Sequence, residues 1–193
     1  MKTAAVILAA GKSQRLGELK QLVRLGDETL LQRAMRVCGE AGCEPVAVVL
    51  GASADVVRKR CALGDAVIVL NQAWAEGMGS SVRAGVRALG ADVDGCVIMT
   101  CDMPAVSAAH LRTLMMTGEV TASAYGGRRG IPAYFPALMF TRLTELRGDA
   151  GARELLKEVR TVELAGGELD IDTVADLERA RLTFGNAPAK RET

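Results

Sequence analysis

A glycine-punctuated basic segment, residues 10–20, directly follows the apolar run Val6-Ile7-Leu8-Ala9. Small residues in such a turn let backbone N–H groups approach an anion, and lysine or arginine side chains neutralise phosphate oxygens. The segment is not a P-loop, because the glycine required five positions before Gly11 is Val6. An ordinary turn with solvated basic residues is the alternative. The positions expected to contact a phosphate are Ala10, Gly11, Lys12, Ser13, Arg15 and Lys20.

A carboxylate, Asp102, stands where a second apolar run, Gly95 to Thr100, meets solvent. Pro104 and a predicted N-cap, Ser107, then start a helix. A triphosphate requires a hard cation with oxygen ligands, and one or two carboxylates together with phosphates and waters satisfy magnesium. Asp102 is therefore the first candidate metal ligand, and a turn residue is the alternative.

A second carboxylate is expected from another strand end at the same edge of the sheet. Residues 169–177 supply Asp170, Asp172 and Asp176 just before a helical segment. Helix N-capping and compensation of the helix dipole are the competing explanation for the first two. We assign that capping role to Asp176.

A fourth segment, residues 71–81, combines glycines and hydroxyls at the start of a helix. Gly77 and Gly79 allow close approach to a ligand, while Ser80 and Ser81 offer hydroxyl groups; an ordinary helix N-cap is the alternative. Trp74 is interpreted as a core or lid residue, and His110 as structural.

The elements that must position these residues alternate between strand and helix. Short apolar runs at 4–9, 45–50, 66–70 and 95–100 predict strands covered on both faces, and 29–40, 54–60, 81–89 and 107–116 have helical periodicity. This order predicts a doubly wound α/β sheet with ligands outside the carboxyl ends of its strands. Residues 121–125 and 133–135 predict an antiparallel hairpin joined through 126–130, followed by helices at 138–146 and 152–158, a strand at 161–164 and a helix at 174–182. We expect one domain over residues 1–184 and a flexible tail over 185–193.

Composition excludes several classes of protein. The net charge of +1 and 3% aromatic residues argue against nucleic-acid binding, and no apolar run approaches the length that spans a bilayer. Five cysteines without a Cys-x-x-Cys pair, and a single histidine, argue against a disulfide framework or a zinc site. The apolar stretch after Met1-Lys2-Thr3 is too short for a secretory signal, so we expect a cytoplasmic protein.

Five ordered blocks between residue 3 and about residue 182 resemble nucleotidyltransferases of the molybdenum-cofactor (MobA-like) type. Leu-Ala-Ala-Gly-x-Ser-x-Arg-Leu-Gly-x-x-Lys resembles their triphosphate loop, Cys-Asp-Met-Pro their metal motif and Asp-Ile-Asp-Thr their second metal segment. The resemblance implies a Rossmann-like, three-layer fold with a mostly parallel mixed sheet. It also implies that Arg15 and Lys20 contact the triphosphate and that Asp102 and Asp172 hold Mg2+. Val174 replaces the proline usual after that threonine.

Two further blocks of the same resemblance concern specificity. Asn-x-x-Trp-x-x-Gly-Met-x-Ser-Ser, residues 71–81, is similar to the cytidylyl-transferring members and implies contact with the base or ribose. Gly-Asp-x-Gly-Ala-Arg, residues 148–153, resembles an acceptor-facing segment and implies substrate contacts by Asp149 and Arg153.

The resemblance implies an enzyme that moves CMP from CTP to molybdopterin and releases pyrophosphate. A molybdenum hydroxylase would be the recipient of the product, and the enzyme would be a monomer or weak oligomer. Two alternatives stay open: a sugar- or alditol-phosphate nucleotidyltransferase, and a non-catalytic chaperone that delivers the finished cofactor to a hydroxylase. The presence of Lys20, Asp102 and Asp172 argues against the chaperone.

Overall fold

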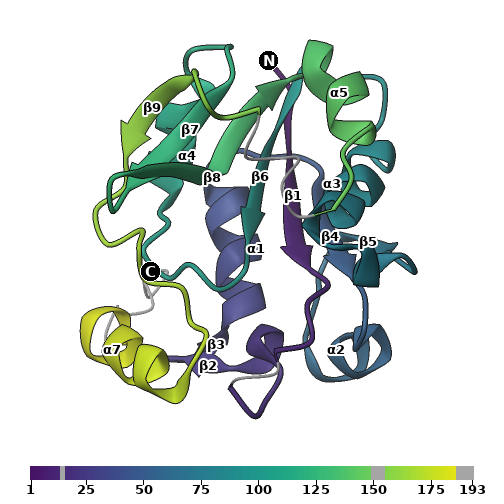
Figure 1. Ribbon diagram of the computed structural model, residues 1–193. Helices are drawn as coiled ribbons and strands as arrows, with labels where there is room; N and C mark the ends of the chain where they lie inside the picture. The colour runs from purple at the N-terminus through teal and green to yellow at the C-terminus, as the bar shows by residue number, and fades with distance from the viewer. Residues whose placement is uncertain (14–15, 149–154, 186–193) are drawn as a thin grey trace, which may run out of the picture.

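The structure, a computed structural model, describes residues 1–13, 16–148 and 155–185 and contains a mixed seven-stranded sheet (Figure 1). The strand order is β5-β4-β1-β6-β8-β7-β9. Neighbouring strands are parallel from β5 through β6 and also between β7 and β9, while β8 runs antiparallel to β6 and β7. The strands are β1 (Thr3–Ala9), β4 (Val46–Leu50), β5 (Val67–Leu70), β6 (Gly95–Thr100), β7 (Thr121–Tyr125), β8 (Arg128–Pro136) and β9 (Arg160–Glu163).

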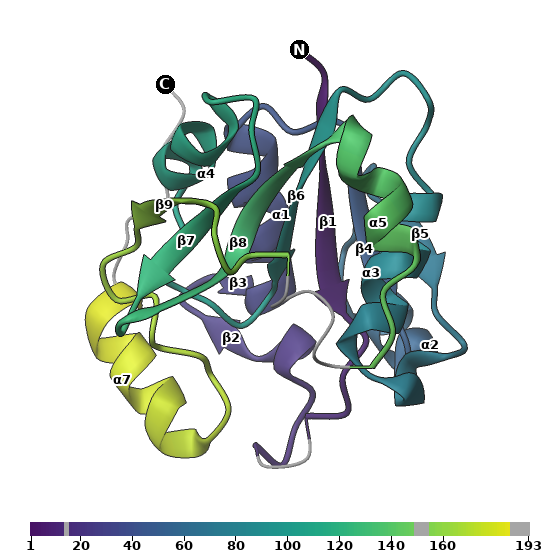
Figure 2. The ribbon, with the colours of Figure 1, turned by 45° about the horizontal axis from the view of Figure 1, so that its top comes forward.

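Helices cover both faces of this sheet (Figure 2). The central strand β1 is buried on both sides, which explains why its sequence is apolar without alternation. Ala5, Ile7 and Ala9 face one core with α1 (Leu30–Glu40), α2 (Ala54–Arg60) and α4 (Ala108–Met115). Ala4, Val6 and Leu8 face a second core with α3 (Met78–Arg87) and α5 (Phe140–Thr144). The expected three-layer α/β fold is confirmed.

A third, smaller cluster lies at the carboxyl edge of the parallel strands. The last helix, α7 (Val174–Phe184), lies there beside the short strands β2 (Arg24–Leu25) and β3 (Glu28–Thr29) (Figure 1). Leu25 of β2, Leu30 of α1 and Leu177 of α7 are buried in this cluster. Neither β2 nor β3 is predicted from the sequence, since each has only two residues. The cluster anchors the C-terminal segment beside the strand ends where the candidate site residues gather.

The predicted hairpin is present, but its turn is shorter than expected. Only Gly126 and Gly127 lie outside β7 and β8, with φ of 55° and 71°. Positive φ at both central residues is the geometry of a two-residue type I′ hairpin turn, and glycine adopts it without steric cost. Arg128, Arg129 and Gly130 therefore belong to β8 instead of to a loop.

Other boundaries differ from the predictions. Helix α3 begins at Met78 instead of Ser81, and a 3-10 helix, Ala137–Met139, precedes a short α5. Within the helix expected at 152–158, residues 155–158 form turns and the others lie outside the described residues, as do 186–193 of the expected tail. All five cysteines are buried and none is in a disulfide. Among the described residues, no helix is long and apolar enough to cross a membrane.

Candidate active site

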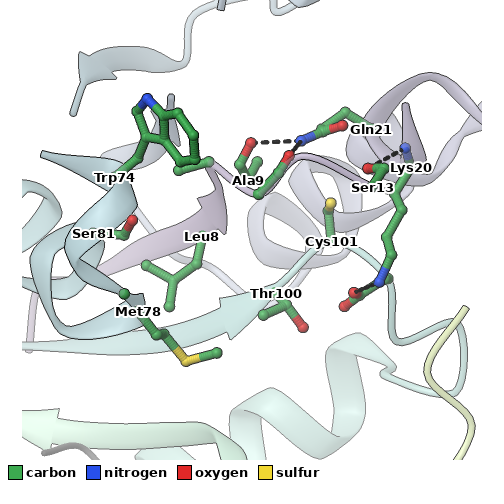
Figure 3. A pocket seen from close by; sticks show the side chains of 14 residues that line it. Leu8, Ala9, Ser13, Lys20, Gln21, Trp74, Met78, Ser81, Thr100 and Cys101 are labelled. Carbon is green, nitrogen blue, oxygen red and sulfur yellow. Dashed lines mark hydrogen bonds and ion pairs between the residues drawn. The ribbon is translucent and has the colours of Figure 1, made fainter. Parts of the chain in front are cut away.

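A pocket of about 330 Å³ opens at the carboxyl ends of β1 and β6. These two strands are neighbours in the sheet, although the chain continues from β1 to β4 on the other side. Such a switch point leaves a crevice where ligands bind in open α/β sheets. In Figure 3, Trp74 stands on one side of the pocket and Lys20 extends along the other, with Leu8 and Thr100 between them and Met78 below Leu8.

One lysine joins the two carboxylates expected to hold a metal. Lys20 Nζ lies 3.0 Å from Asp102 Oδ2 and also forms an ion pair with Asp172 Oδ1. Burial alone would lower the pKa of Lys20, but the two carboxylates outweigh it, so the pKa rises above its usual value. The ammonium is therefore protonated at neutral pH, and it occupies a space that suits a cation with oxygen ligands.

Asp172 reaches this position by a route that differs from the expectation. It does not end a strand, because β9 ends at Glu163 and a loop then returns to the carboxyl edge of the sheet. The Ile171 N–H donates to the Asp102 carbonyl at 3.0 Å, which joins this loop to the one after β6. A backbone contact between two loops therefore brings the two carboxylates together.

The neighbouring aspartates have different surroundings. Thr173 caps α7 in a capping box with Asp176, whose pKa falls to about 2 through hydrogen bonds from Thr173 and then Arg179. This supports the capping role of Asp176, and Val174 in place of proline still begins the helix. Burial, followed by the charges of Asp102 and Asp172, raises the pKa of Asp170 to about 6.

Gln21 shapes the loop after β1, a role that the sequence did not indicate. Its side-chain amide donates to the carbonyls of Ala9, at 2.7 Å, and Gly11, at 3.3 Å, and the residue is only 3% exposed. The Lys20 N–H donates to Ser13 Oγ at 2.9 Å, and Ser13 adopts a φ of 53°. Ala10, Gly11, Ser13 and Lys20 all line the pocket as a result.

Lys12 lies on the other side of this loop. Its ammonium is 4.7 Å from the centroid of the Trp74 ring, which is a cation–π contact. Gly51 makes room for this arrangement, since a Cβ there would lie 2.8 Å from the Trp74 Cβ. Trp74 lines the pocket, as a lid residue would.

Some residues of the segment from Gly77 to Ser81 line the pocket, and others contact the protein. Gly77 and Ser81 line the pocket. The Gly79 N–H donates to the Gly148 carbonyl at 2.9 Å, and the Ser80 hydroxyl donates to the Gly77 carbonyl at 2.8 Å. Gly79 and Ser80 thus contact protein here, and substrate contact by them stays a prediction. Asn71 donates to both serine hydroxyls, a role that the sequence did not indicate.

His110 and Cys101 have no reactive role in this geometry. Ser123 Oγ donates to the Pro132 carbonyl, so His110 Nε2, 2.7 Å away, must donate to Ser123. Burial lowers the pKa of His110, and the ring is a neutral structural donor. Cys101 lines the pocket, but burial raises the pKa of its thiol, which stays protonated.

A second pocket, of about 660 Å³, shares Lys20, Met78, Thr100 and Asp102 with the first. Asp172 lines the second pocket and also a space beside Gly11 and Ser13 of the glycine loop. The far wall of the second pocket is formed by the β7–β8 hairpin. The lysine and the carboxylates therefore lie between two spaces, one on the glycine-loop side and one on the hairpin side. Arg15, Asp149 and Arg153, which were predicted to contact substrate, lie outside the described residues.

Comparisons with known proteins agree with the class of protein that this arrangement indicates, a nucleotidyltransferase. Residues 5–164 match the family model of the MobA-like NTP transferase domain. The chain belongs to this family of nucleotidyltransferases, as its sequence motifs predicted.

The relatives carry several names. Nicotine blue oxidoreductase of Paenarthrobacter nicotinovorans is 33% identical, over 90% of this chain and 94% of that protein. Purine catabolism protein PucB of Bacillus subtilis (strain 168) is 32% identical, over 91% and 94%. A probable molybdenum cofactor guanylyltransferase of Opitutus terrae is 29% identical, over 98% and 93%.

The most informative similarity among solved structures is to Rv0371c from Mycobacterium tuberculosis H37Rv. It is 31% identical, with a TM-score of 0.85 over 94% of this chain and 98% of that one. A complex of Rv0371c with manganese has a TM-score of 0.79 at 28% identity, over 95% and 100% of the two chains. Members of the family depend on a divalent metal.

Proposed function

We propose that this enzyme transfers CMP from CTP to the terminal phosphate of a molybdopterin-type acceptor, with Mg2+ as the metal and pyrophosphate as the second product. The observation that carries the proposal is that Lys20 and Asp102 line both pockets, while Asp172 lines the second pocket and forms an ion pair with the same lysine. CTP would occupy the glycine-loop side and the acceptor the hairpin side. The finished dinucleotide would then pass to a molybdenum hydroxylase.

The donor set at this position fits a divalent cation. Two carboxylates already enclose a positive charge, the Lys20 ammonium, and oxygen donors are the ligands that magnesium prefers. Asp102 and Asp172 would hold the metal, which when bound neutralises charge on the α-phosphate. Displaced from the carboxylates, the Lys20 ammonium would lie next to the same phosphate.

The reaction itself needs few groups from the protein. An oxygen of the acceptor phosphate forms a bond to the α-phosphorus, and the bond from that phosphorus to the β-phosphate oxygen breaks as pyrophosphate leaves. A phosphate monoester is already largely ionised at neutral pH, with a second pKa of about 6, so no general base is required. Lys20 and the backbone of residues 10–13 would stabilise the charge that develops on the transferred and leaving phosphates.

The choice of base is the finest part of the proposal. Leu8, Gly77 and Ser81 line the pocket where the base would lie, and residues 71–81 resemble cytidylyl-transferring enzymes. The similarity to a probable molybdenum cofactor guanylyltransferase is an argument for guanine instead. CTP and GTP should therefore be compared side by side at equal concentration, and faster turnover with GTP would contradict the cytosine assignment.

Pyrophosphate release is the decisive measurement. The protein is supplied with CTP and Mg2+, together with molybdopterin, a sugar phosphate or an alditol phosphate. We expect release only with molybdopterin. Pyrophosphate release with only a sugar phosphate or an alditol phosphate would show that this compound, and not molybdopterin, is the acceptor. No pyrophosphate release with any triphosphate would favour a chaperone that binds the finished dinucleotide.

A further inference from the structure

The wall of the second pocket that faces Lys20 carries an aromatic ring held from several sides. Tyr125, the last residue of β7, is 7% exposed, and its hydroxyl donates to the Ile131 carbonyl at 2.9 Å. Gly130 and Gly167 leave room for the ring, because a Cβ at Gly130 would collide with the Tyr125 hydroxyl and one at Gly167 would lie 2.9 Å from Tyr125 Cδ1. The ring is therefore a fixed platform inside the pocket.

Arg128 rests on this platform. Its guanidinium carbon lies 5.2 Å from the centroid of the Tyr125 ring, and both residues line the second pocket together with Lys20. Throughout residues 1–13, 16–148 and 155–185, no carboxylate forms an ion pair with Arg128. A guanidinium stacked on a ring keeps its edge N–H groups available for a planar pair of oxygens.

The next residue provides a contrast. Arg129 lines the same pocket, but its guanidinium donates to the Lys157 carbonyl. It joins the hairpin to the turn at 155–158. The two adjacent arginines therefore differ in what they bind, although both are exposed and close to the same pocket.

The carboxylates around the pocket would repel an anionic acceptor unless an unpaired cation offset their charge. Asp102, Asp170 and Asp172 line it, and three carboxylates repel an anionic acceptor. Lys20 is engaged with two of them. A phosphate that approaches from the hairpin side meets the guanidinium of Arg128, whereas that of Arg129, in the same pocket, is bound to the Lys157 carbonyl.

We propose that Arg128, supported by Tyr125, binds the phosphate monoester of the acceptor and so selects phosphorylated acceptors. This inference rests on the proposed transfer to an acceptor phosphate. It assigns the selection to the hairpin, whereas the glycine loop binds the nucleotide triphosphate.

The test compares a pterin that carries a phosphate monoester with its dephosphorylated alcohol: 6-hydroxymethylpterin phosphate and 6-hydroxymethylpterin. Binding to the nucleotide-free protein is measured by calorimetry for the wild type, Arg128→Met and Arg129→Met, and CTP affinity is measured for each. We expect the wild type and Arg129→Met to prefer the phosphate ester by about tenfold, which is about 1.4 kcal/mol. Arg128→Met should lose that preference while its CTP affinity is unchanged.

Several results would overturn the assignment. They are equal binding of ester and alcohol by the wild type, equal loss in both variants, or weaker CTP binding in Arg128→Met, which would place Arg128 on the triphosphate. Arg128→Lys keeps a positive charge without the planar pair of donors, so it should retain part of the preference. If the ester preference depends on Arg128 but no pyrophosphate is released with any acceptor, the transfer reaction is wrong and the phosphate site stands.

Discussion

Replacing Lys20 by methionine removes the ammonium between Asp102 and Asp172 while keeping most of the length of the side chain. Both partners are at least partly shielded from water, since the side chains of Lys20 and Asp102 are 18% and 17% exposed and that of Asp172 is 35% exposed. The two carboxylates then lie close together without the positive charge that separates them. We expect a less stable protein in the absence of metal, and stronger metal binding.

The magnitude follows from the 3.0 Å separation of Lys20 Nζ and Asp102 Oδ2. At an effective dielectric constant of about 20, that separation gives a gross attraction of about 5.5 kcal/mol. Desolvation of the charged groups offsets much of this attraction. Breaking a fully buried ion pair costs about 3 to 5 kcal/mol, and breaking an exposed ion pair costs at most about 1 kcal/mol. For this partly exposed site we expect a loss of about 2 kcal/mol. At about 2 to 4 °C per kcal/mol for a chain of this size, Tm falls by about 4 to 8 °C.

Thermal unfolding followed by circular dichroism, in EDTA and then in millimolar Mn2+, measures both effects. Mn2+ should raise the Tm of Lys20→Met more than that of the wild type, because it no longer competes with the ammonium. Lys12→Met is the matched control, since Lys12 contacts the Trp74 ring instead of a carboxylate. An unchanged Tm for Lys20→Met in EDTA, or an equal response of both proteins to Mn2+, would refute the idea that lysine and metal share one position.

Three further results are expected. Asp102→Asn should abolish metal-dependent turnover, because an amide is a poor substitute for a carboxylate ligand. Its Tm should fall less than that of Lys20→Met, since Lys20 keeps its ion pair with Asp172; equal turnover at matched Mg2+ would remove Asp102 from the metal site. Gly85→Ala should destabilise the protein by about 1 to 3 kcal/mol in urea unfolding, since its Cβ would collide with Val6 Cγ1, whereas Gly39→Ala, with nothing within 4 Å, should stabilise α1 by up to about 1 kcal/mol. The pKa of His110 is lowered in the folded protein, so the unfolded chain binds the proton first and stability falls as the pH drops below about 6.5. In His110→Gln the loss of stability in acid should be smaller, although the variant is less stable than the wild type at pH 8. Identical dependence of stability on pH in the two proteins would contradict the neutral buried ring.

The elements of the sheet were predictable because their cause is local in sequence. A run such as Val6-Ile7-Leu8-Ala9 is apolar on both faces, and this pattern is enough to indicate a strand between two layers of helices. The site at the carboxyl ends then followed from topology, which predicted the position of Asp102 beside the loop after β1.

Other parts of the site depend on contacts between distant segments. Gln21 binds the carbonyls of Ala9 and Gly11, and nothing in its neighbourhood in the sequence distinguishes it from a surface glutamine. Asp172 was assigned through the resemblance to a family motif, and the expectation that it ends a strand was wrong. The short strands β2 and β3, and the start of α3 at Met78, depend on packing that periodicity does not record.

The hydrogen bond from Ile171 to the Asp102 carbonyl forms only after the ribosome has synthesised the C-terminal segment. All seven strands of the sheet precede Asp172, which enters only with the segment that carries α7. Because domains fold as the chain leaves the ribosome, N-terminal part first, the sheet can pair its strands before the second carboxylate arrives. A nascent chain halted or clipped after β9 would keep the glycine loop and Lys20 but possess half of the carboxylate pair. If Asp102 and Asp172 hold the metal as proposed, translation of the last segment separates a chain that can bind the nucleotide from one that can also turn it over.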